Sequence, residues 1–230
     1  MKLRAPWLTR TPSATPSPTL IVLIAPGGTD ESYRPFSPWQ GSAVRMYPFT
    51  WSIRWRFGAA VAVHQLRYRV YGWNGGQASP MPYARAALEE MTRRHPDVPV
   101  VVIGHSMGGR VAAQLGADER IVGVLGLAPW WQHADWRHIH DDVRVRAVHG
   151  SADTVTYAHR TAKGIAELAA RDMDADYLEV PGGGHPMLDH VGLWQTAALD
   201  FVGDTLTALR GPQAPTWRRA APESSPTNPS

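Results

Sequence analysis

The segment Val100–Gly109, which reads VVVIGHSMGG, restricts the fold more than any other part of the chain. Its four leading apolar residues are typical of a strand covered on both faces, as the strands of a parallel sheet are. The glycines of the following G-x-S-x-G pattern let a strand and a helix approach closely through a sharp turn, with the serine in a strained backbone geometry. The segment therefore predicts a strand–turn–helix unit with the Ser106 hydroxyl exposed at its tip. Taken alone, the pentapeptide is equally compatible with an ordinary tight turn that carries a surface serine.

The rest of the chain has the composition of one globular domain, with 43% hydrophobic and 19% charged residues among 230. It contains no apolar run of membrane-spanning length and no apolar stretch typical of a secretory signal. Cysteine is absent, which excludes disulfides and thiol nucleophiles and is consistent with a reducing compartment. We therefore expect a cytoplasmic protein without a membrane partner.

The positive charge of the chain does not indicate nucleic-acid binding. The net charge is +3 and the sequence pI is about 9.4. Nearly all of the positively charged residues are arginines. The arginines form no block of the length expected for a nucleic-acid tail, and the pair in Arg67–Arg69 is too short. We expect no nucleic-acid partner.

Strand and helix patterns alternate along the chain between two polar ends. The Pro-, Ser- and Thr-rich residues 1–19 and the stretch 211–230 are predicted to be disordered tails around a folded domain at residues 20–210. The predicted strands are Leu20–Ile24, Ala60–Leu66, Pro99–Ile103, Ile121–Leu127, Arg144–Val148 and Asp176–Val180. The predicted helices are Tyr83–Arg94, Met107–Leu115, Thr156–Arg171 and Leu188–Leu209, with Trp39–Phe57 partly helical and interrupted at Pro48. This alternation predicts an α/β fold, with a doubly wound and mainly parallel sheet of about six strands flanked by helices.

Candidate catalytic groups follow three of the predicted strands. Ser106 ends the third strand, Asp153 follows the fifth, and His185 follows the last strand after the turn Pro181–Gly184. Ligands of such sheets bind beyond the carboxyl ends of the strands, where these three side chains are expected to meet. The order nucleophile, acid, histidine predicts that His185 accepts the Ser106 proton while Asp153 orients the imidazole.

Each partner also has a simpler interpretation on its own. Asp153 has the position of a turn or helix-capping residue, and His185 that of a solvated loop histidine. His190 is a second candidate for the base, although it falls in the following predicted helix.

An acyl-transfer site also needs donors for the developing oxyanion. The Met107 N–H opens the helix after the serine and is the first candidate donor. The first strand ends in Ala25–Thr29, whose glycines let the backbone approach a substrate, so the Gly28 or Thr29 N–H is the second candidate. An ordinary Gly-Gly turn is the alternative there.

The elbow Gly104–Gly109, the segment His149-Gly150-x-x-Asp153 and the pair Gly184-His185 together resemble the α/β-hydrolase superfamily. The likeness covers about residues 20–209, and the short spacing is similar to compact, lidless members such as dienelactone-hydrolase-like proteins and small carboxylesterases. It implies a minimal fold without a large cap and a serine hydrolase that needs neither cofactor nor metal. The chain departs from the pattern in two ways. Pro26 replaces the usual histidine after the first strand, and the two N-terminal strands of larger members are absent. Dienelactone hydrolases proper use a cysteine, which this chain lacks.

Residues 128–142 lie where larger relatives carry a lid. Trp130, Trp131 and Trp136 are predicted to wall a substrate pocket, with burial in the core as the equal alternative. The same stretch holds several histidines and aspartates whose spacing does not fit a helical metal-ligand pair, so no metal site is predicted. The side chains considered were His133, Asp135, His138, His140, Asp141 and Asp142.

Two further tryptophans, Trp51 and Trp55, stand four residues apart, and this spacing favours a buried helix face. The leading functional hypothesis is cleavage of small to medium carboxylic esters, or of thioesters, through an acyl-enzyme. A non-hydrolytic enzyme with the same triad, such as a perhydrolase or lyase, and a catalytically silent ligand-binding homologue are the alternatives. The sequence leaves the oligomeric state open.

Overall fold

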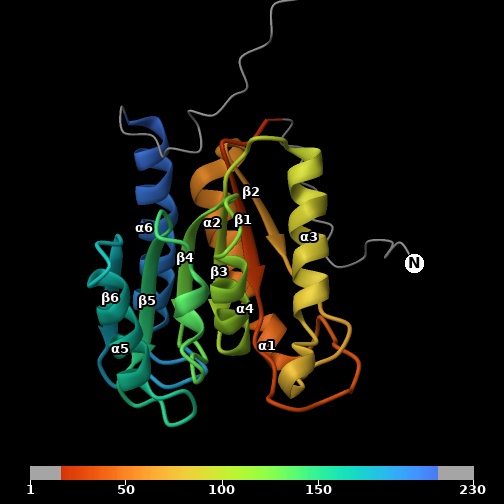
Figure 1. Cartoon of the computed structure of the whole chain (residues 1–230), viewed down its shortest axis with the longest axis vertical. Helices are drawn as coiled ribbons and strands as arrows, with labels where there is room; N and C mark the ends of the chain where they lie inside the picture. Colours follow the sequence, from red (N-terminus) through yellow and green to blue (C-terminus); the bar gives the residue numbers. More distant parts are fainter. Residues whose placement is uncertain (1–16, 212–230) are drawn as a thin grey trace, which may run out of the picture.

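The computed structural model describes residues 17–211, which form a six-stranded parallel sheet between two layers of helices (Figure 1). The sheet order is β2-β1-β3-β4-β5-β6, as the alternating pattern predicts. The strands are β1 Leu20–Ala25, β2 Val61–Gln65, β3 Val100–His105, β4 Ile121–Leu127, β5 Arg144–Gly150 and β6 Ala175–Val180. The α-helices are α1 Gly41–Val44, α2 Tyr47–Phe57, α3 Met81–Arg94, α4 Met107–Leu115, α5 Ala158–Ala169 and α6 Val191–Arg210. Short 3-10 turns lie at Gly58–Ala60, Gly75–Gln77 and Asp135–His138.

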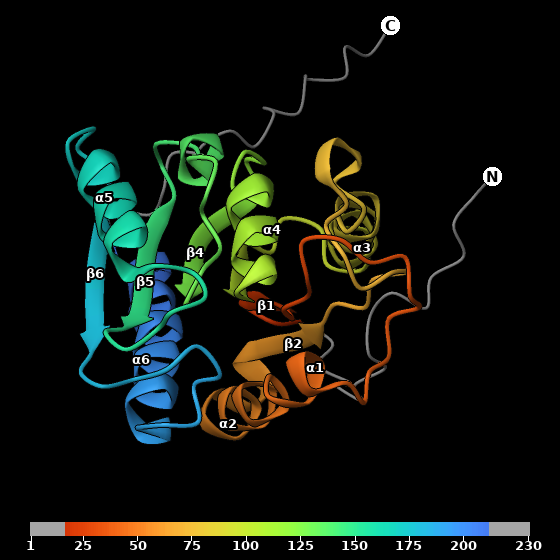
Figure 2. The same cartoon turned by 90° about the horizontal axis from the view of Figure 1, so that it is seen from below.

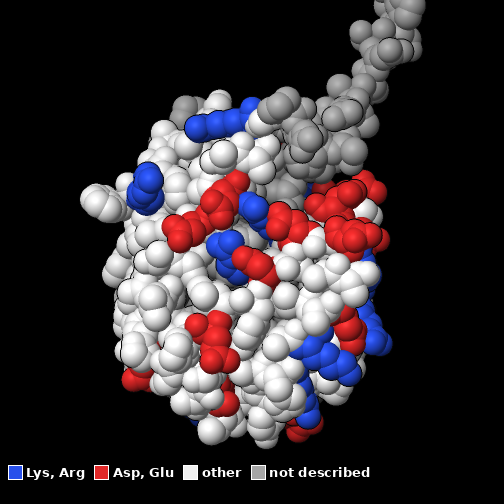
Figure 3. Space-filling model, turned by 90° about the vertical axis from the view of Figure 1, so that its left-hand side faces the viewer, with Lys and Arg blue, Asp and Glu red and all other residues white. Residues whose placement is uncertain are grey.

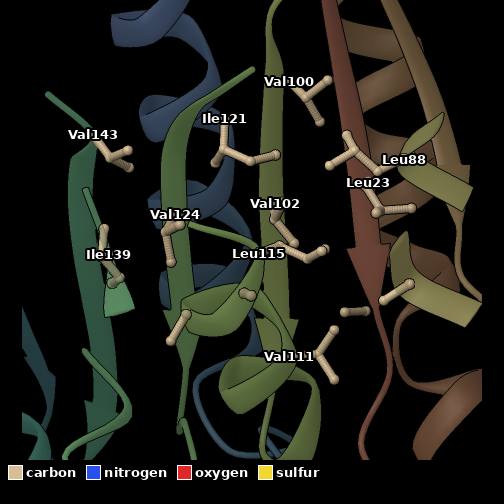
Figure 4. Close-up of a cluster of buried hydrophobic side chains, with 14 of the residues drawn as sticks. Leu23, Leu88, Val100, Val102, Val111, Leu115, Ile121, Val124, Ile139 and Val143 are labelled. Atoms are coloured by element: carbon tan, nitrogen blue, oxygen red, sulfur yellow. The ribbon is translucent and has the colours of Figure 1, made fainter. Parts of the chain in front are cut away.

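The helices cover both faces of the sheet and create two hydrophobic layers. Helices α3, α4 and α5 pack on one face and α2 and α6 on the other (Figures 1 and 2). Strands β1, β3 and β4 are buried at every position, which explains their uninterrupted apolar sequences. Figure 4 shows the first layer, in which Val102 of β3 and Val124 of β4 lie near Leu115 and Val111 of α4.

The parallel strands end at the lower side of the molecule in Figure 1, and Figure 2 is viewed from that side. The central β3 therefore delivers its last residues to the middle of this end. Strands β5 and β6 deliver theirs toward one side of it, since β6 is the edge strand. The surface on the β6 side carries interspersed acidic and basic residues (Figure 3), among them the ion pairs Arg144–Asp174 and Arg146–Asp176 at 2.7 and 2.8 Å.

Several element boundaries differ from the sequence prediction. The stretch 39–57 divides into α1 and α2, and Pro48 stands in the first turn of α2, where its missing N–H costs no hydrogen bond. Helix α5 begins after Thr156 because that side chain bonds to neighbouring loops, and Tyr157 has a positive φ of 52°. Helix α6 begins after His190, whose φ is 54°.

The predicted tails lie mostly outside the described residues, at 1–16 and 212–230. Within the description Thr19, assigned to the first tail, donates its N–H to the Ala60 carbonyl at 2.9 Å and so joins the folded domain. No helix among residues 17–211 is both long and apolar enough to cross a membrane.

Candidate active site

Ser106 occupies a strained turn between β3 and α4. Its φ of 54° and ψ of −120° lie in a region that L-residues rarely adopt, at a cost of about 1–3 kcal/mol. Two hydrogen bonds hold this backbone: the Ser106 N–H donates to the Leu127 carbonyl at 3.1 Å, and the Trp130 N–H donates to the Ser106 carbonyl at 3.0 Å. The sheet and the loop after β4 thus impose the strained turn that the G-x-S-x-G pattern predicts. Ser106 is nevertheless only 8% exposed, so its hydroxyl does not stand open at the tip of the turn as predicted.

The glycines around Ser106 are required because no side chain fits at their positions. A Cβ on Gly104 would overlap the Gly108 carbonyl, and a Cβ on Gly108 would overlap the Ala25 carbonyl. A Cβ on Gly109 would lie 2.5 Å from the Pro129 side chain. The turn therefore brings β1, β3 and α4 into backbone contact, which only glycine permits.

His185 and Asp153 complete a hydrogen-bonded chain that starts at Ser106. The Ser106 Oγ lies 3.0 Å from His185 Nε2, and His185 Nδ1 lies 2.8 Å from Asp153 Oδ2. The Asp153 side chain is fully buried, whereas the imidazole of His185 keeps some exposure toward solvent. The structure thus brings together the three residues that the strand ends predict. The fallback base, His190, is instead exposed immediately before α6.

The loops that carry Asp153 and His185 are joined through their backbones. A Cβ on Gly150 would overlap the Gly183 carbonyl, so these two glycines are in direct contact. The Ala152 N–H donates to the Gly183 carbonyl at 3.1 Å, and Ser151 Oγ accepts the Gly182 N–H at 2.8 Å. Asp153 and His185 are therefore positioned as one unit, although 32 residues separate them.

Asp153 is surrounded by donors. Its Oδ1 accepts the N–H groups of Val155 and Thr156 at 2.7 and 3.1 Å. Its Oδ2 accepts from His149 Nε2 at 3.0 Å, from the Thr156 hydroxyl at 2.8 Å and from His185. Burial alone raises the pKa of the Asp153 carboxyl, but the hydrogen bonds from His149, His185 and Val155 outweigh it and hold the pKa well below its usual range. The group is a carboxylate in the folded protein.

Sequence reasoning did not identify His149 or Thr156 as partners of the carboxylate. His149 is fully buried, and its other ring nitrogen, Nδ1, lies 2.9 Å from the Thr161 hydroxyl. With Nε2 protonated toward Asp153, Nδ1 accepts a hydrogen bond from Thr161. Thr156 also reaches the Ala128 carbonyl at 3.2 Å. The one signal in the sequence was the i, i+4 spacing of His149 and Asp153.

His105, the residue before Ser106, supports the loop that carries His185. Its Nε2 donates to the His185 carbonyl at 2.9 Å, and the two imidazole rings lie 4.9 Å apart. Burial lowers the pKa of His105 to about 3, so the ring is neutral. His105 is buried at the end of β3.

Two of the three predicted oxyanion donors remain available. The Met107 N–H opens α4 and has no partner within the helix. A Cβ on Gly28 would lie 2.5 Å from the Met107 methyl group, so these two residues are adjacent, and Gly28 makes no backbone hydrogen bond within residues 17–211. The Thr29 N–H already donates to the Tyr71 carbonyl at 3.2 Å, so the prediction of Thr29 as an oxyanion donor is wrong. Gly27, which the sequence prediction omitted, lies closer to the nucleophile: its Cβ would be 3.3 Å from that of Ser106.

The predicted tryptophan wall is largely part of the core. Trp131 and Trp136 are 1% and 5% exposed. Trp131 Nε1 donates to the Gly109 carbonyl at 3.1 Å, and Trp136 Nε1 donates to Glu167 on α5 at 2.9 Å. These two rings therefore fill space between β4, α4 and α5, which corrects their assignment as pocket residues. Trp130 is also buried, but its backbone touches Ser106 and its ring lies 5.0 Å from the Arg110 guanidinium.

The acidic and histidine side chains of residues 133–142 do not converge. Asp135 pairs with Arg110 at 2.7 Å, Asp141 pairs with Arg171, and His140 lies 3.8 Å from Asp142. Within residues 17–211 no three His, Asp or Glu side chains are grouped so that they could hold a metal ion.

Comparisons with known proteins agree with this geometry at the level of the fold. Neither protein-family profiles nor curated proteins match the chain. Among solved structures, XC6422 from Xanthomonas campestris, described as an α/β serine hydrolase without a lid, superposes with a TM-score of 0.64 at 14% identity. That match covers 82% of this chain and 83% of XC6422. The chain has the α/β-hydrolase fold.

Two other α/β-hydrolase structures have similar scores. ATU1826 from Agrobacterium tumefaciens, a putative α/β hydrolase, has a TM-score of 0.66 at 17% identity over 84% of this chain and 87% of its own. Est1E from Butyrivibrio proteoclasticus has a TM-score of 0.60 at 13% identity, and the match covers 84% of this chain and 90% of Est1E. The α/β-hydrolase fold predicted from three motifs is thus confirmed.

Proposed function

We propose that this protein is a serine hydrolase that cleaves small to medium carboxylic esters through an acyl-enzyme. The observation that carries the proposal is the continuous chain from Ser106 Oγ through His185 to Asp153, with distances of 3.0 and 2.8 Å. It joins a nucleophile in a strained turn, a base and a buried carboxylate in the geometry of a catalytic triad. The esterases and hydrolases among the structural neighbours support the same reaction class.

In the acylation step, Ser106 Oγ attacks the ester carbonyl carbon while His185 Nε2 takes the hydroxyl proton. Asp153 accepts the Nδ1–H of His185 and stabilises the resulting imidazolium. The negative oxygen of the tetrahedral intermediate faces the N–H groups of Met107 and Gly28. When the C–O bond to the leaving group breaks, His185 returns its proton to the departing alcohol.

Deacylation repeats these steps with water as the nucleophile. His185 takes a proton from water as the water oxygen attacks the acyl carbon, and it then returns that proton to Ser106 Oγ. A carboxylic acid leaves and the enzyme is restored. Each donor of the oxyanion site contributes about 10²–10³ in rate in enzymes of this type.

The reaction is tested by labelling with a fluorophosphonate, which reacts only with an activated serine. Wild type should be labelled and Ser106→Ala should not. Equal labelling of both proteins would refute the assignment of the nucleophile. An unlabelled, folded wild type would favour the catalytically silent ligand-binding alternative.

The substrate class is tested with p-nitrophenyl esters of increasing acyl length, together with a thioester. We expect acetate and butyrate to be cleaved faster than palmitate, because the segment between β4 and β5 is too short to form a large cap over Ser106. Est1E has also been solved with ferulic acid bound, so a ferulate ester belongs in the panel. Faster cleavage of palmitate would contradict the open site.

A further inference from the structure

Helix α2 is apolar on both sides, which is unusual for a helix on the surface of a domain. Its inner side buries Phe49 and Ile53 against the sheet. On its outer side Trp51 and Trp55 are 64% and 89% exposed, contrary to the buried helix face that their spacing predicts. A surface helix normally turns polar residues outward. The outer side of α2 therefore lacks a partner within residues 17–211.

Three exposed rings, Trp39, Trp51 and Trp55, and the half-buried ring of Tyr47 form a group that we call the aromatic face. Tyr47 and Trp51 stack, with ring centroids 5.9 Å apart and planes 17° apart. The Tyr47 hydroxyl donates to the Pro38 carbonyl at 3.0 Å, which holds the segment carrying Trp39 against the beginning of α2. Trp39 itself is 81% exposed. The Tyr47–Trp51 stack and the Tyr47–Pro38 hydrogen bond thus order part of the aromatic face.

All the charged Lys, Arg, Asp and Glu residues in the stretch of sequence that contains the aromatic face are positively charged. Residues 32–88 contain seven arginines and no aspartate or glutamate. Arg45, Arg54 and Arg56 lie next to or within α2. The remaining described residues, 17–31 and 89–211, contain 11 Lys and Arg against 19 Asp and Glu. The positive charge of the described domain is therefore concentrated in the part that presents the tryptophans.

Exposed tryptophans flanked by arginines match the interface of an anionic lipid bilayer. Indole rings are favoured at the headgroup level, where the ring is buried and its N–H stays hydrated. Arginines beside them are attracted to anionic headgroups. A purely electrostatic partner, such as a nucleic acid, would use the arginines but leave three large apolar rings in water. Contrary to the expectation of no membrane partner, we propose that the aromatic face docks this protein on the surface of an anionic lipid membrane.

Helix α2, which carries Trp51 and Trp55, lies beside the segment that leads from His185 into α6 (Figure 2). Ser52 Oγ donates to Gln195 Oε1 at 2.8 Å and so joins α2 to the first turns of α6. Leu188 and Val191, which follow His185 in this segment, are also exposed. Docking through α2 would bring this segment, and with it the loop that carries His185, near the lipid surface. The docking surface is independent of the proposed hydrolysis, because its residues take no part in the triad.

The proposal is tested by sedimentation with vesicles, using the full chain with Ser106→Ala so that no lipid is cleaved. We expect binding to vesicles of phosphatidylcholine mixed with phosphatidylglycerol, decreasing with salt, and little binding to phosphatidylcholine alone. The double variant Trp51→Ala/Trp55→Ala should lower the bound fraction about tenfold or more. Arg56→Gln should lower it about fivefold. Both changes lie at exposed positions, and thermal unfolding checks that the fold is kept.

Matched controls lie at the opposite edge of the sheet. Leu178→Ala on β6 and Arg137→Gln after β4 remove an exposed apolar and an exposed basic side chain, and neither should change vesicle binding. The absence of binding to mixed vesicles, or unchanged binding by the tryptophan variant, would overturn the proposal. Equal affinity for an oligonucleotide that also survives the tryptophan change would assign the arginines to nucleic acid instead. In an otherwise wild-type background, the tryptophan variant should cleave p-nitrophenyl acetate normally, which separates docking from hydrolysis.

Discussion

The two halves of the candidate site are held in place by opposite means. On the nucleophile side, after β1 and β3, glycines at positions 27, 28, 104 and 108 let backbones touch one another and Ser106. On the acid side, after β5 and β6, five hydrogen bonds converge on the buried carboxylate of Asp153. We therefore expect the half around Ser106 to be disrupted by an added side-chain atom. We expect the half around Asp153 to be disrupted by the loss of a hydrogen-bond donor or acceptor. Substitutions on each side can test this difference.

The largest effect is expected on the acid side, from Asp153→Asn. The amide keeps the shape of the carboxylate, but its NH2 group would face groups that themselves donate hydrogen bonds to Asp153. His185 would then be held in the wrong tautomer, and its imidazolium form would lose the negative charge that stabilises it. We expect kcat to fall about 10⁴-fold. Esterase assays measure this loss. Asp174→Asn, which breaks the exposed pair with Arg144, is the control and should leave kcat unchanged. If kcat of Asp153→Asn falls less than tenfold, Asp153 has only the structural role of a turn residue.

The second effect belongs to the nucleophile side. In Gly108→Ala the new methyl group meets the carbonyls of Ala25 and Pro26, which are backbone atoms and cannot move aside. We expect the free energy of unfolding to fall by about 3 kcal/mol or more. Gly192→Ala, where α6 leaves open space around the new methyl group, should be neutral or slightly stabilising. Urea denaturation measures the stability of both variants. Equal stabilities would show that the turn around Ser106 can accommodate a methyl group at position 108.

The third prediction concerns His149, a positioning residue that acts through Asp153. His149→Phe keeps the ring but removes one donor, so the pKa of the Asp153 carboxyl should rise toward its ordinary value. We expect kcat to fall about 10- to 100-fold with little change in KM. The acid limb of the pH–rate profile should move to higher pH.

A purely structural role for His149 would lower the fraction of folded enzyme and leave that limb in place. His149→Gln retains an N–H donor and should recover part of kcat. Failure of Gln to exceed Phe would contradict the role of the hydrogen bond.

The smallest effect is a dependence of stability on pH. Burial lowers the pKa of His105 to about 3 and that of His64, on β2, to about 4, against an ordinary value near 6.5. Below pH 6.5 the unfolded chain therefore binds protons that the folded protein does not, and acidification favours unfolding. We expect each of the two imidazoles to lower the free energy of unfolding by roughly 1 kcal/mol per pH unit between pH 6.5 and 4.5. Below about pH 4 the carboxyl of Asp153 binds a proton in the unfolded chain but not in the folded protein, and this adds to the loss.

Urea denaturation over a series of pH values measures this slope. His64→Gln should make it shallower, because one of the two buried imidazoles is removed. A slope identical to that of wild type would show that His64 does not contribute.

The elements that were predictable from the sequence are those fixed by local patterns. The strand β3 is buried at every position, so it begins with four apolar residues. Ser106 follows β3 directly, and Asp153 and His185 come three and five residues after the ends of β5 and β6. The environment of a tryptophan depends on distant contacts instead. Trp131 is buried because the Gly109 carbonyl lies within reach of its indole N–H, whereas Trp51 is exposed because the other side of its helix already packs on the sheet.

The order of the strands has a consequence for how activity is lost on heating. Ser106 follows β3 in the centre of the sheet, while His185 follows β6, an edge strand whose residues are mostly not buried. Such an edge opens locally at a lower free energy than the whole domain unfolds. Detachment of β6 would withdraw the base from the nucleophile while the two hydrophobic layers remain intact. Heat should therefore inactivate this protein reversibly several degrees before it melts.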